Sequence, residues 1–184
     1  MSLSYKKLAV KFAQKILGRP IGSFYAPKTE YYNFDALWQD NRIKSRTVAQ
    51  LAKYLSRNVR GLNGINKIVA TDTVTVNFSF GTVPVISSVA ERLGKDLLIW
   101  SESDNADVDP HRVFGKLNKN DRVLIVHDLL RGAITIKDVV NTIAARRCKI
   151  KGIVILINTT DATELSQIGS FNVGYPVPIY SFVS

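Results

Sequence analysis

Residues 121–145 read DRVLIVHDLLRGAITIKDVVNTIAA and change their hydrophobic period once along the way. The apolar run Val123–Val126 lies between polar residues, which is typical of a strand buried on both faces. After Thr135 the apolar residues recur at the helical spacing i, i+3, i+4 and i+7: Ile136, Val139, Val140 and Ile143. Because a helix follows the strand after a short loop, its free N–H groups are expected at the end of that strand, where they favour an anion.

Three more aliphatic runs have the character of buried strands, at residues 68–70, 97–100 and 153–157. Helical stripes separate them, one over residues 46–59 and one that begins near Pro84. Buried strands that alternate with helices predict an α/β fold with a doubly wound, mostly parallel sheet. The prolines of residues 176–183 suit an edge strand, so this segment is expected to close the sheet.

The N-terminal part differs from this pattern. Residues 8–17 carry a helical apolar stripe with lysines opposite, and residues 22–38 are rich in aromatic side chains. A turn at Pro27 separates two short strand-like runs, Phe24–Tyr25 and Tyr31–Phe34, which predicts a hairpin. We therefore expect a single domain over residues 1–184, with a small unit at about residues 18–40 within it.

Composition and charge limit the class of protein. The net charge of +10 favours anionic partners such as phosphates or nucleic acid. The single cysteine, Cys148, excludes an internal disulfide; with no signal-peptide pattern or apolar run of about 20 residues, this favours a cytoplasmic protein. Cys148 lies among Arg146, Arg147 and Lys149, which would lower its pKa if the thiol were reactive; a structural thiol is the alternative.

The segment around His127-Asp128 resembles a known motif. An aliphatic strand, an acidic pair, a short Thr/Gly-rich loop and a helix form the phosphoribosyl-diphosphate motif of type I phosphoribosyltransferases. Residues 22–38 are similar to the N-terminal hood of orotate phosphoribosyltransferases, which covers the base. The resemblance extends over nearly the whole chain in the order and spacing of its elements.

This resemblance implies a set of ligand contacts. Asp128 would hold the ribose, and Lys28 of the hood would lie on the base side. The phosphate would lie in the loop before the helix, at Arg131, Gly132, Ala133 and Thr135. It also implies phosphoribosyl diphosphate as substrate, Mg²⁺ as cofactor and a homodimer. The sequence identifies neither a catalytic residue nor a metal ligand.

The chain departs from the family pattern at several chemical positions. His127 replaces one carboxylate of the acidic pair, and residues 71–81 keep only Gly81 of the glycines expected in the diphosphate loop. Residues 101–110 are acidic where the orotate enzymes carry a lysine-rich loop, and no arginine follows Ile157. Lost cationic contacts weaken the stabilisation of a departing diphosphate, so we expect weakened or lost orotate transfer.

Three functions remain open from the sequence. The first is an orotate-phosphoribosyltransferase-like protein, which would transfer ribose 5-phosphate to a pyrimidine-like base with weakened or lost activity. The second is a non-catalytic regulatory protein that binds a nucleotide or phosphoribosyl compound. The third is a basic nucleic-acid-binding protein on the same scaffold, the weakest of the three because Lys and Arg are scattered over several helices rather than gathered in a known reading motif.

Overall fold

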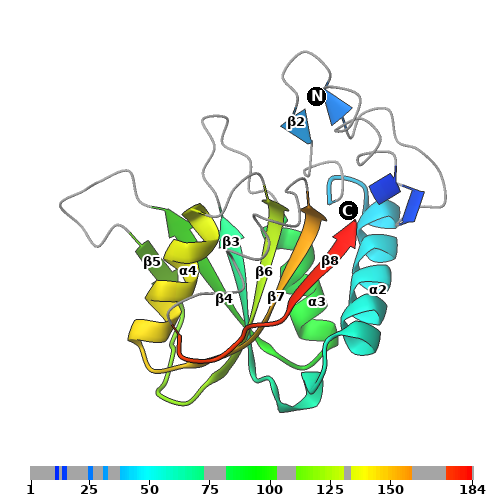
Figure 1. Cartoon of the computed structure of the whole chain (residues 1–184). Helices are drawn as coiled ribbons and strands as arrows, with labels where there is room; N and C mark the ends of the chain where they lie inside the picture. The colour runs from blue at the N-terminus through cyan, green and yellow to red at the C-terminus, as the bar shows by residue number, and fades with distance from the viewer. Residues whose placement is uncertain are drawn as a thin grey trace.

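The computed structural model describes residues 11–12, 14–15, 25–26, 31–32, 38–72, 82–102, 111–130, 134–158 and 173–183. Its centre is a six-stranded sheet in the order β5-β4-β3-β6-β7-β8 (Figure 1). The strands are β3 (Lys67–Asp72), β4 (Asp96–Glu102), β5 (His111–Phe114), β6 (Arg122–Leu130), β7 (Lys149–Asn158) and β8 (Ile179–Val183). All neighbouring strands are parallel except β4 and β5.

The predicted parallel sheet is therefore confirmed. Each of the four aliphatic runs lies in a strand, and Val123, Leu124 and Ile125 of β6 are fully buried. The last strand, β8, pairs with β7 alone, as expected for an edge strand with prolines before it. Strand β3 lies between β4 and β6, so the chain winds outward in both directions from the middle of the sheet.

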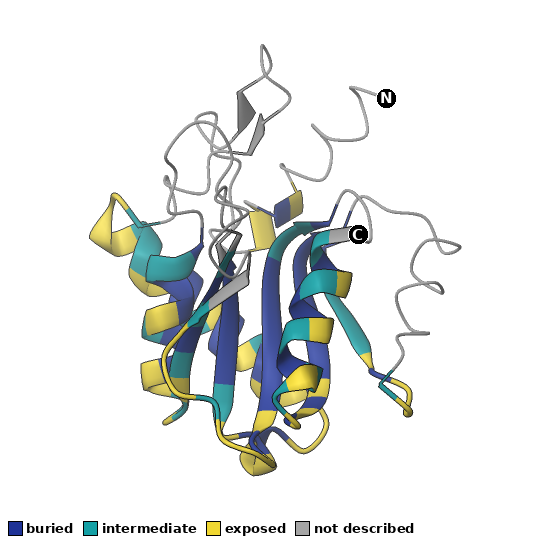
Figure 2. Cartoon of the chain, turned by 90° about the vertical axis from the view of Figure 1, so that its left-hand side faces the viewer, coloured by how far each residue is buried: buried dark blue, intermediate teal, exposed yellow. Residues whose placement is uncertain are grey.

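Helices cover both faces of this sheet. On one face, α2 (Asn41–Asn58) and α3 (Val83–Arg92) pack against β3, β6 and β7 through a core that includes Leu51, Leu55 and Ile86. On the other face, α4 (Ile134–Ala145) contributes Ile136, Val139, Val140 and Ile143 to a second core. Figure 2 shows the buried strands in dark blue between helices whose outer surfaces are exposed.

Helix α2 begins at Asn41, so the predicted start at Arg46 is wrong. Asp40 is the N-cap: its Oδ1 accepts hydrogen bonds from the backbone N–H groups of Arg42 at 2.7 Å and Ile43 at 3.3 Å. The added turn, residues 41–45, is polar except for Ile43, which packs against the core. Hydrophobic periodicity alone therefore placed the start too late.

Strand β5 was not predicted. Its residues pair antiparallel with β4, from Ile99 opposite Phe114 to Glu102 opposite His111. The expected acidic loop at 101–110 is shorter than predicted at its start, because β4 continues to Glu102. At its other end the loop leads directly into β5, which begins after Pro110. The remainder of that loop lies outside the described residues.

The N-terminal hairpin is confirmed in its strands. β1 (Tyr25–Ala26) and β2 (Tyr31–Tyr32) pair antiparallel, apart from the six-stranded sheet. Of the predicted helix at 8–17, Lys11, Phe12, Gln14 and Lys15 are described, and all four are helical. Phe12 packs edge-on against Phe182 of β8, with ring centroids 5.7 Å apart. None of the helices in the described segments is long and apolar enough to cross a membrane.

Candidate functional site

The sheet has a topological switch point between β3 and β6. From β3 the chain crosses to β4 through α3, whereas from β6 it crosses in the opposite direction to β7 through α4. In open α/β sheets, ligands bind beyond the carboxyl ends of the strands at such a point. Thr71, near the end of β3, and His127-Asp128 of β6 lie at this edge.

His127 is fixed inside the protein at the switch point. Its side chain is only 4% exposed, and its Nδ1 lies 2.7 Å from Oγ1 of Thr71. Burial lowers the pKa of His127 below its ordinary value, although the charge of Asp128 and a hydrogen bond with the Leu129 backbone act in the opposite direction. The imidazole is therefore neutral near pH 7 and is held by Thr71, and it supplies no negative charge to a ligand.

Asp128 is the carboxylate at this end of β6. Its Oδ1 accepts a hydrogen bond of 2.7 Å from the backbone N–H of Leu129 and lies 3.8 Å from Nδ1 of His127. The side chain keeps 13% of its surface exposed. Asp128 thus has one oxygen engaged with Leu129, and its second oxygen accepts no hydrogen bond from the described residues.

Two helix N-termini open towards the same edge of the sheet. Helix α3 follows β3, and α4 follows β6, as Figure 1 shows. Neither helix has an acidic residue in its first turn. Thr82, the N-cap of α3, is buried, and its Oγ1 has no hydrogen-bond partner among the described residues. Two helix N-termini at one edge of the sheet, without acidic residues in their first turns, suit a ligand with two anionic groups.

The predicted site residues fall partly outside the described structure. Asp128 lies at the carboxyl end of β6, and Thr135 lies, half-buried, in the first turn of α4. Lys28, Arg131, Gly132 and Ala133 lie outside the described residues. The contact between Thr71 and His127 was not predicted, because 56 residues separate them in the sequence and only the pairing of β3 with β6 brings them together.

Mg²⁺ would need oxygen ligands at this edge. No group of three His, Cys, Asp or Glu side chains that would hold a metal ion occurs among the residues with a described position. In phosphoryl-compound sites Mg²⁺ is often held by one or two carboxylates together with the phosphates of the ligand. Asp128 fits such a shared site as a single carboxylate.

Cys148 has the properties of a structural thiol. It is buried, with Sγ 3.3 Å from the carbonyl oxygen of Asn118. Burial raises the pKa of the thiol, as does the charge of Asp121, and Arg146 only partly opposes them. The hypothesis of a reactive, acidic thiol is therefore not supported.

A pocket of about 520 Å³ lies elsewhere, at the carboxyl end of the edge strand β8. Lys15 lines it and donates a hydrogen bond to the carbonyl oxygen of Phe182, with its Nζ 4.2 Å from the centre of the Phe182 ring. Burial lowers the pKa of Lys15. Since β6 and β7 lie between the switch point and β8, this pocket is not part of the candidate site.

Comparison with solved structures finds several proteins of similar fold. Adenine phosphoribosyltransferase from Rhodothermus marinus superposes with a TM-score of 0.61 at 14% identity, over 99% of this chain and 98% of that chain. The enzyme of the same name from Trypanosoma brucei, solved with AMP, pyrophosphate and ribose-5-phosphate, gives 0.58 at 14% identity over 82% and 68%. Leishmania donovani UMP synthase gives 0.58 at 18% identity, over 94% of this chain but 36% of that chain.

The fold is that of the type I phosphoribosyltransferases. At sequence identities of only 11–18%, these superpositions show a shared fold but not a shared activity. No protein-family model matches the chain, and no curated protein matches it.

Proposed function

We propose that this protein binds a phosphoribosyl compound at the switch point and has weakened orotate-phosphoribosyltransferase-like activity. The observation that carries the proposal is that α3 and α4 both begin at the edge of the sheet that holds Asp128, with no acidic residue in the first turn of either helix. Phosphoribosyl diphosphate carries a phosphate and a diphosphate on either side of a ribose. One helix N-terminus for each, with a carboxylate between them, matches that distribution of charge.

The proposal gives a role to each candidate site residue. Asp128 accepts hydrogen bonds from the ribose hydroxyls, and Thr135 donates its hydroxyl to the 5′-phosphate beside Arg131, Gly132 and Ala133. Thr82 offers its unpartnered hydroxyl at the N-terminus of α3, on the diphosphate side. Mg²⁺, when bound with the substrate, would neutralise charge on the diphosphate oxygens.

Weak activity is proposed because His127 cannot act as the second carboxylate. It is neutral, buried and engaged with Thr71, so a ribose would have one charged acceptor instead of two. The absence of an arginine after Ile157 removes a bidentate partner for an orotate carboxylate. Loss of one such contact costs about 3–4 kcal/mol of transition-state stabilisation, or about 10²–10³ in rate. Two losses together would slow turnover by several orders of magnitude.

Calorimetry with phosphoribosyl diphosphate, with and without Mg²⁺, tests the binding. We expect Asp128→Asn to weaken binding and Arg131→Ala with Thr135→Val to abolish binding of inorganic phosphate. Lys137→Gln, on the exposed side of α4, is the matched control and should bind as the unchanged protein does. Equal binding by all variants would place the ligand elsewhere.

Release of diphosphate with orotate, uracil or adenine tests the activity. Orotate turnover near about 10 s⁻¹, the middle of the range for enzymes, would contradict the weakened activity. Adenine is included because several proteins of similar fold are adenine phosphoribosyltransferases. Turnover with adenine alone would show that the accepted base is a purine and not orotate. Binding without turnover for any base would favour the second function, a regulatory protein that senses a phosphoribosyl compound.

We also propose a homodimer, since members of the resembling family pair. Light scattering at micromolar concentrations should give twice the mass of the 20.5 kDa chain. A monomer mass across this range would contradict it.

A further inference from the structure

We propose that the amino-terminal end of the sheet, opposite the candidate site, is a binding surface for single-stranded nucleic acid. Four connections meet there, at residues 57–67, 91–96, 115–122 and 146–151. Together they contain twelve Lys or Arg and three Asp or Glu, a net charge of +9 out of the +10 of the whole chain. We call these four segments the basic end.

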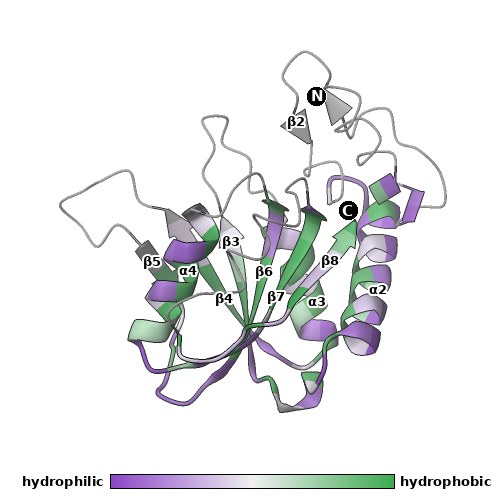
Figure 3. Ribbon diagram, viewed as in Figure 1, coloured by the Kyte–Doolittle hydropathy of each residue, from purple (hydrophilic) through white to green (hydrophobic). Residues whose placement is uncertain are grey.

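Topology gathers these charges. The segments lead into β3, β4, β6 and β7, which are parallel and therefore begin at the same edge. The register shows how close they come, because Lys67 pairs with both Asp96 and Val123, and Arg122 pairs with Lys149. In Figure 3 the connections at the lower end of the sheet carry much purple, the colour of hydrophilic residues.

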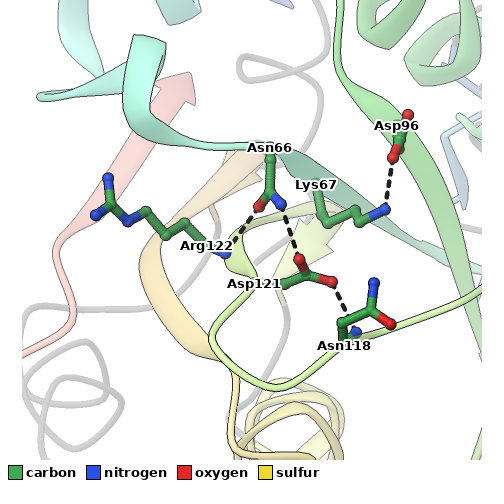
Figure 4. Close-up of polar contacts among 6 residues, drawn as sticks. All are labelled: Asn66, Lys67, Asp96, Asn118, Asp121 and Arg122. Carbon is green, nitrogen blue, oxygen red and sulfur yellow. Dashed lines mark hydrogen bonds and ion pairs between the residues drawn. The ribbon is translucent and has the colours of Figure 1, made fainter.

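Most of these cations face solvent. Nine of the twelve are exposed, and the other three, Lys67, Lys95 and Arg146, are half-buried. Lys67 is paired with Asp96. Asp121, directly before β6, is another carboxylate at this end of the sheet. It accepts hydrogen bonds from the side chain of Asn66 at 2.8 Å and the backbone N–H of Asn118 at 2.7 Å. Figure 4 shows that the guanidinium of Arg122 extends away from Asp121, so this carboxylate does not neutralise it.

Stabilisation of helix ends explains only part of this charge. Arg57 and Arg92 lie in the last turns of α2 and α3, where a cation complements the helix dipole. Lys149 and Lys151 belong to β7, and Arg122 belongs to β6 directly beside Lys149. Like charges on neighbouring strands repel each other, which opposes folding. A polyanion that bridges them removes this repulsion.

Arg147 provides a second, independent indication. Its backbone has φ +59°, in the left-handed region that favours glycine or asparagine after a helix. An arginine there adopts a strained conformation at a position where glycine would relieve the strain. The side chain of Arg147 is exposed. Because glycine would suit this turn better, we assign the exposed cation of Arg147 to binding and not to the stability of the turn.

Aromatic side chains indicate the kind of polyanion. Phe114 and Tyr175, at 54% and 40% exposure, are the exposed large hydrophobic residues of the described structure. Tyr175 accepts a hydrogen bond of 2.8 Å from the backbone N–H of Ile150, which holds its ring beside Lys149 and Lys151. Phe114 directly precedes the basic segment 115–122. Rings among cations stack with unpaired bases, whereas a membrane surface is usually bound through a broad apolar helix face.

Fluorescence anisotropy with a labelled single strand of about 20 nucleotides tests this surface, as RNA and as DNA of one sequence. Binding should weaken steeply between about 0.05 and 0.3 M NaCl, because each neutralised phosphate adds about 0.7 to the slope of log affinity against log salt. A duplex that binds as tightly or tighter overturns the preference for single strands. Comparable binding of polyglutamate or of phosphatidylserine vesicles overturns the choice of nucleic acid.

Variants locate the surface. Lys149→Gln with Lys151→Gln should weaken binding at least tenfold and reduce the salt slope by about 1.4. Lys53→Gln with Lys137→Gln removes two exposed cations from the sides of α2 and α4, and this control should stay within twofold of the unchanged protein. Equal losses in the two pairs would show a general charge effect and overturn the proposal.

Arg147→Gly separates binding from folding. It should raise the melting temperature, because glycine accepts the left-handed backbone, and should still weaken nucleic-acid binding severalfold. Unchanged binding by this more stable variant would overturn the role given to Arg147. Since the basic end and the switch point lie at opposite ends of the sheet, binding of phosphoribosyl diphosphate should be the same in all these variants.

Discussion

At the scale of single residues, His127 and its partner Thr71 distinguish this chain from the motif it resembles. The sequence was sufficient to identify the replacement of a carboxylate by histidine. It was not sufficient to show that the imidazole is buried and bonded to Thr71 at 2.7 Å, because the partner lies on another strand. A residue interpreted as a ligand position is thus part of the interior of the protein, and of the pair His127-Asp128 only Asp128 keeps a charged carboxylate for the proposed ligand.

The buried histidine should make the protein less stable in mild acid. Because its folded-state pKa is lowered, the unfolded chain binds a proton first as the pH falls. The free energy of unfolding should therefore be highest above about pH 6.5 and decrease below it, by at most about 1.4 kcal/mol per pH unit. Urea unfolding at about pH 7.5, 6.5 and 5.5 measures this. In His127→Gln the dependence should be shallower; an identical slope would exclude His127 as its cause.

Asp121 should act in a lower pH window. Burial raises its pKa, but the hydrogen bonds from Asn118 and Asn66 and the charge of Lys67 together bring the pKa below its ordinary value. Its contribution is present above the unfolded-state pKa and is lost as the pH falls through the folded-state pKa. Asp121→Ala leaves two donors without an acceptor, so it should cost about 1–3 kcal/mol at neutral pH.

Urea unfolding of Asp121→Ala should show that this cost starts to shrink below about pH 4 and is lost at still lower pH, where the carboxylate of the folded protein is protonated. Glu91→Ala, at the exposed end of α3, is the control and should change stability little. A cost for Asp121→Ala that is the same at neutral and acid pH would contradict the role of the charge.

At the scale of elements, the strength of the hydrophobic pattern determined what was predictable. The parallel strands were found because each is a run of aliphatic residues buried on both faces. Strand β5 was missed because its four residues, HRVF, have no such run and follow an acidic segment. The first turn of α2 was missed because a capping Asp40, and not an apolar stripe, defines its start.

Gly152 in β7 illustrates a constraint from packing between elements. A Cβ at this position would lie 2.9 Å from Cε2 of Tyr180 and 3.3 Å from Cδ1 of Leu124. The ring of Tyr180 is held in place, since its hydroxyl accepts a hydrogen bond from the Arg60 backbone. Gly152→Ala should therefore destabilise the protein by about 1–3 kcal/mol, measured by urea unfolding.

The double variant Gly152→Ala with Tyr180→Leu identifies the cause of this cost. If the clash is with the Tyr180 ring, the alanine should cost less in the Tyr180→Leu background than alone. Equal costs in both backgrounds would show that the ring is not responsible.

At the scale of the whole molecule, the structure brings together charges that are far apart in the sequence. The twelve Lys and Arg of the basic end lie in four segments that are far apart in the sequence, so no local run of charge reveals them. Only the parallel order of β3, β4, β6 and β7 brings those segments to one end. The candidate site was predictable as a position, at the end of an aliphatic strand before a helix, whereas the basic end was not, since no local pattern encodes it.

This uneven distribution of charge should make stability depend on salt. At low ionic strength the cations of the basic end repel one another over the Debye length, about 30 Å at 0.01 M, and salt shortens it to about 8 Å at 0.15 M. The melting temperature should therefore rise on adding NaCl. An effect of about 1 kcal/mol corresponds to about 2–4 °C for a chain of this size.

The same charge variants test whether the basic end causes this salt effect. The double variant Lys149→Gln with Lys151→Gln relieves the repulsion between Arg122 and Lys149 of β7. Its melting temperature should therefore be higher than that of the unchanged protein at low salt and should rise less on adding NaCl. Lys53→Gln with Lys137→Gln removes the same charge from the helix sides and should keep most of the salt effect. If both double variants lost the salt effect equally, the effect would come from the net charge of the whole molecule and not from the cations gathered at the amino-terminal end of the sheet.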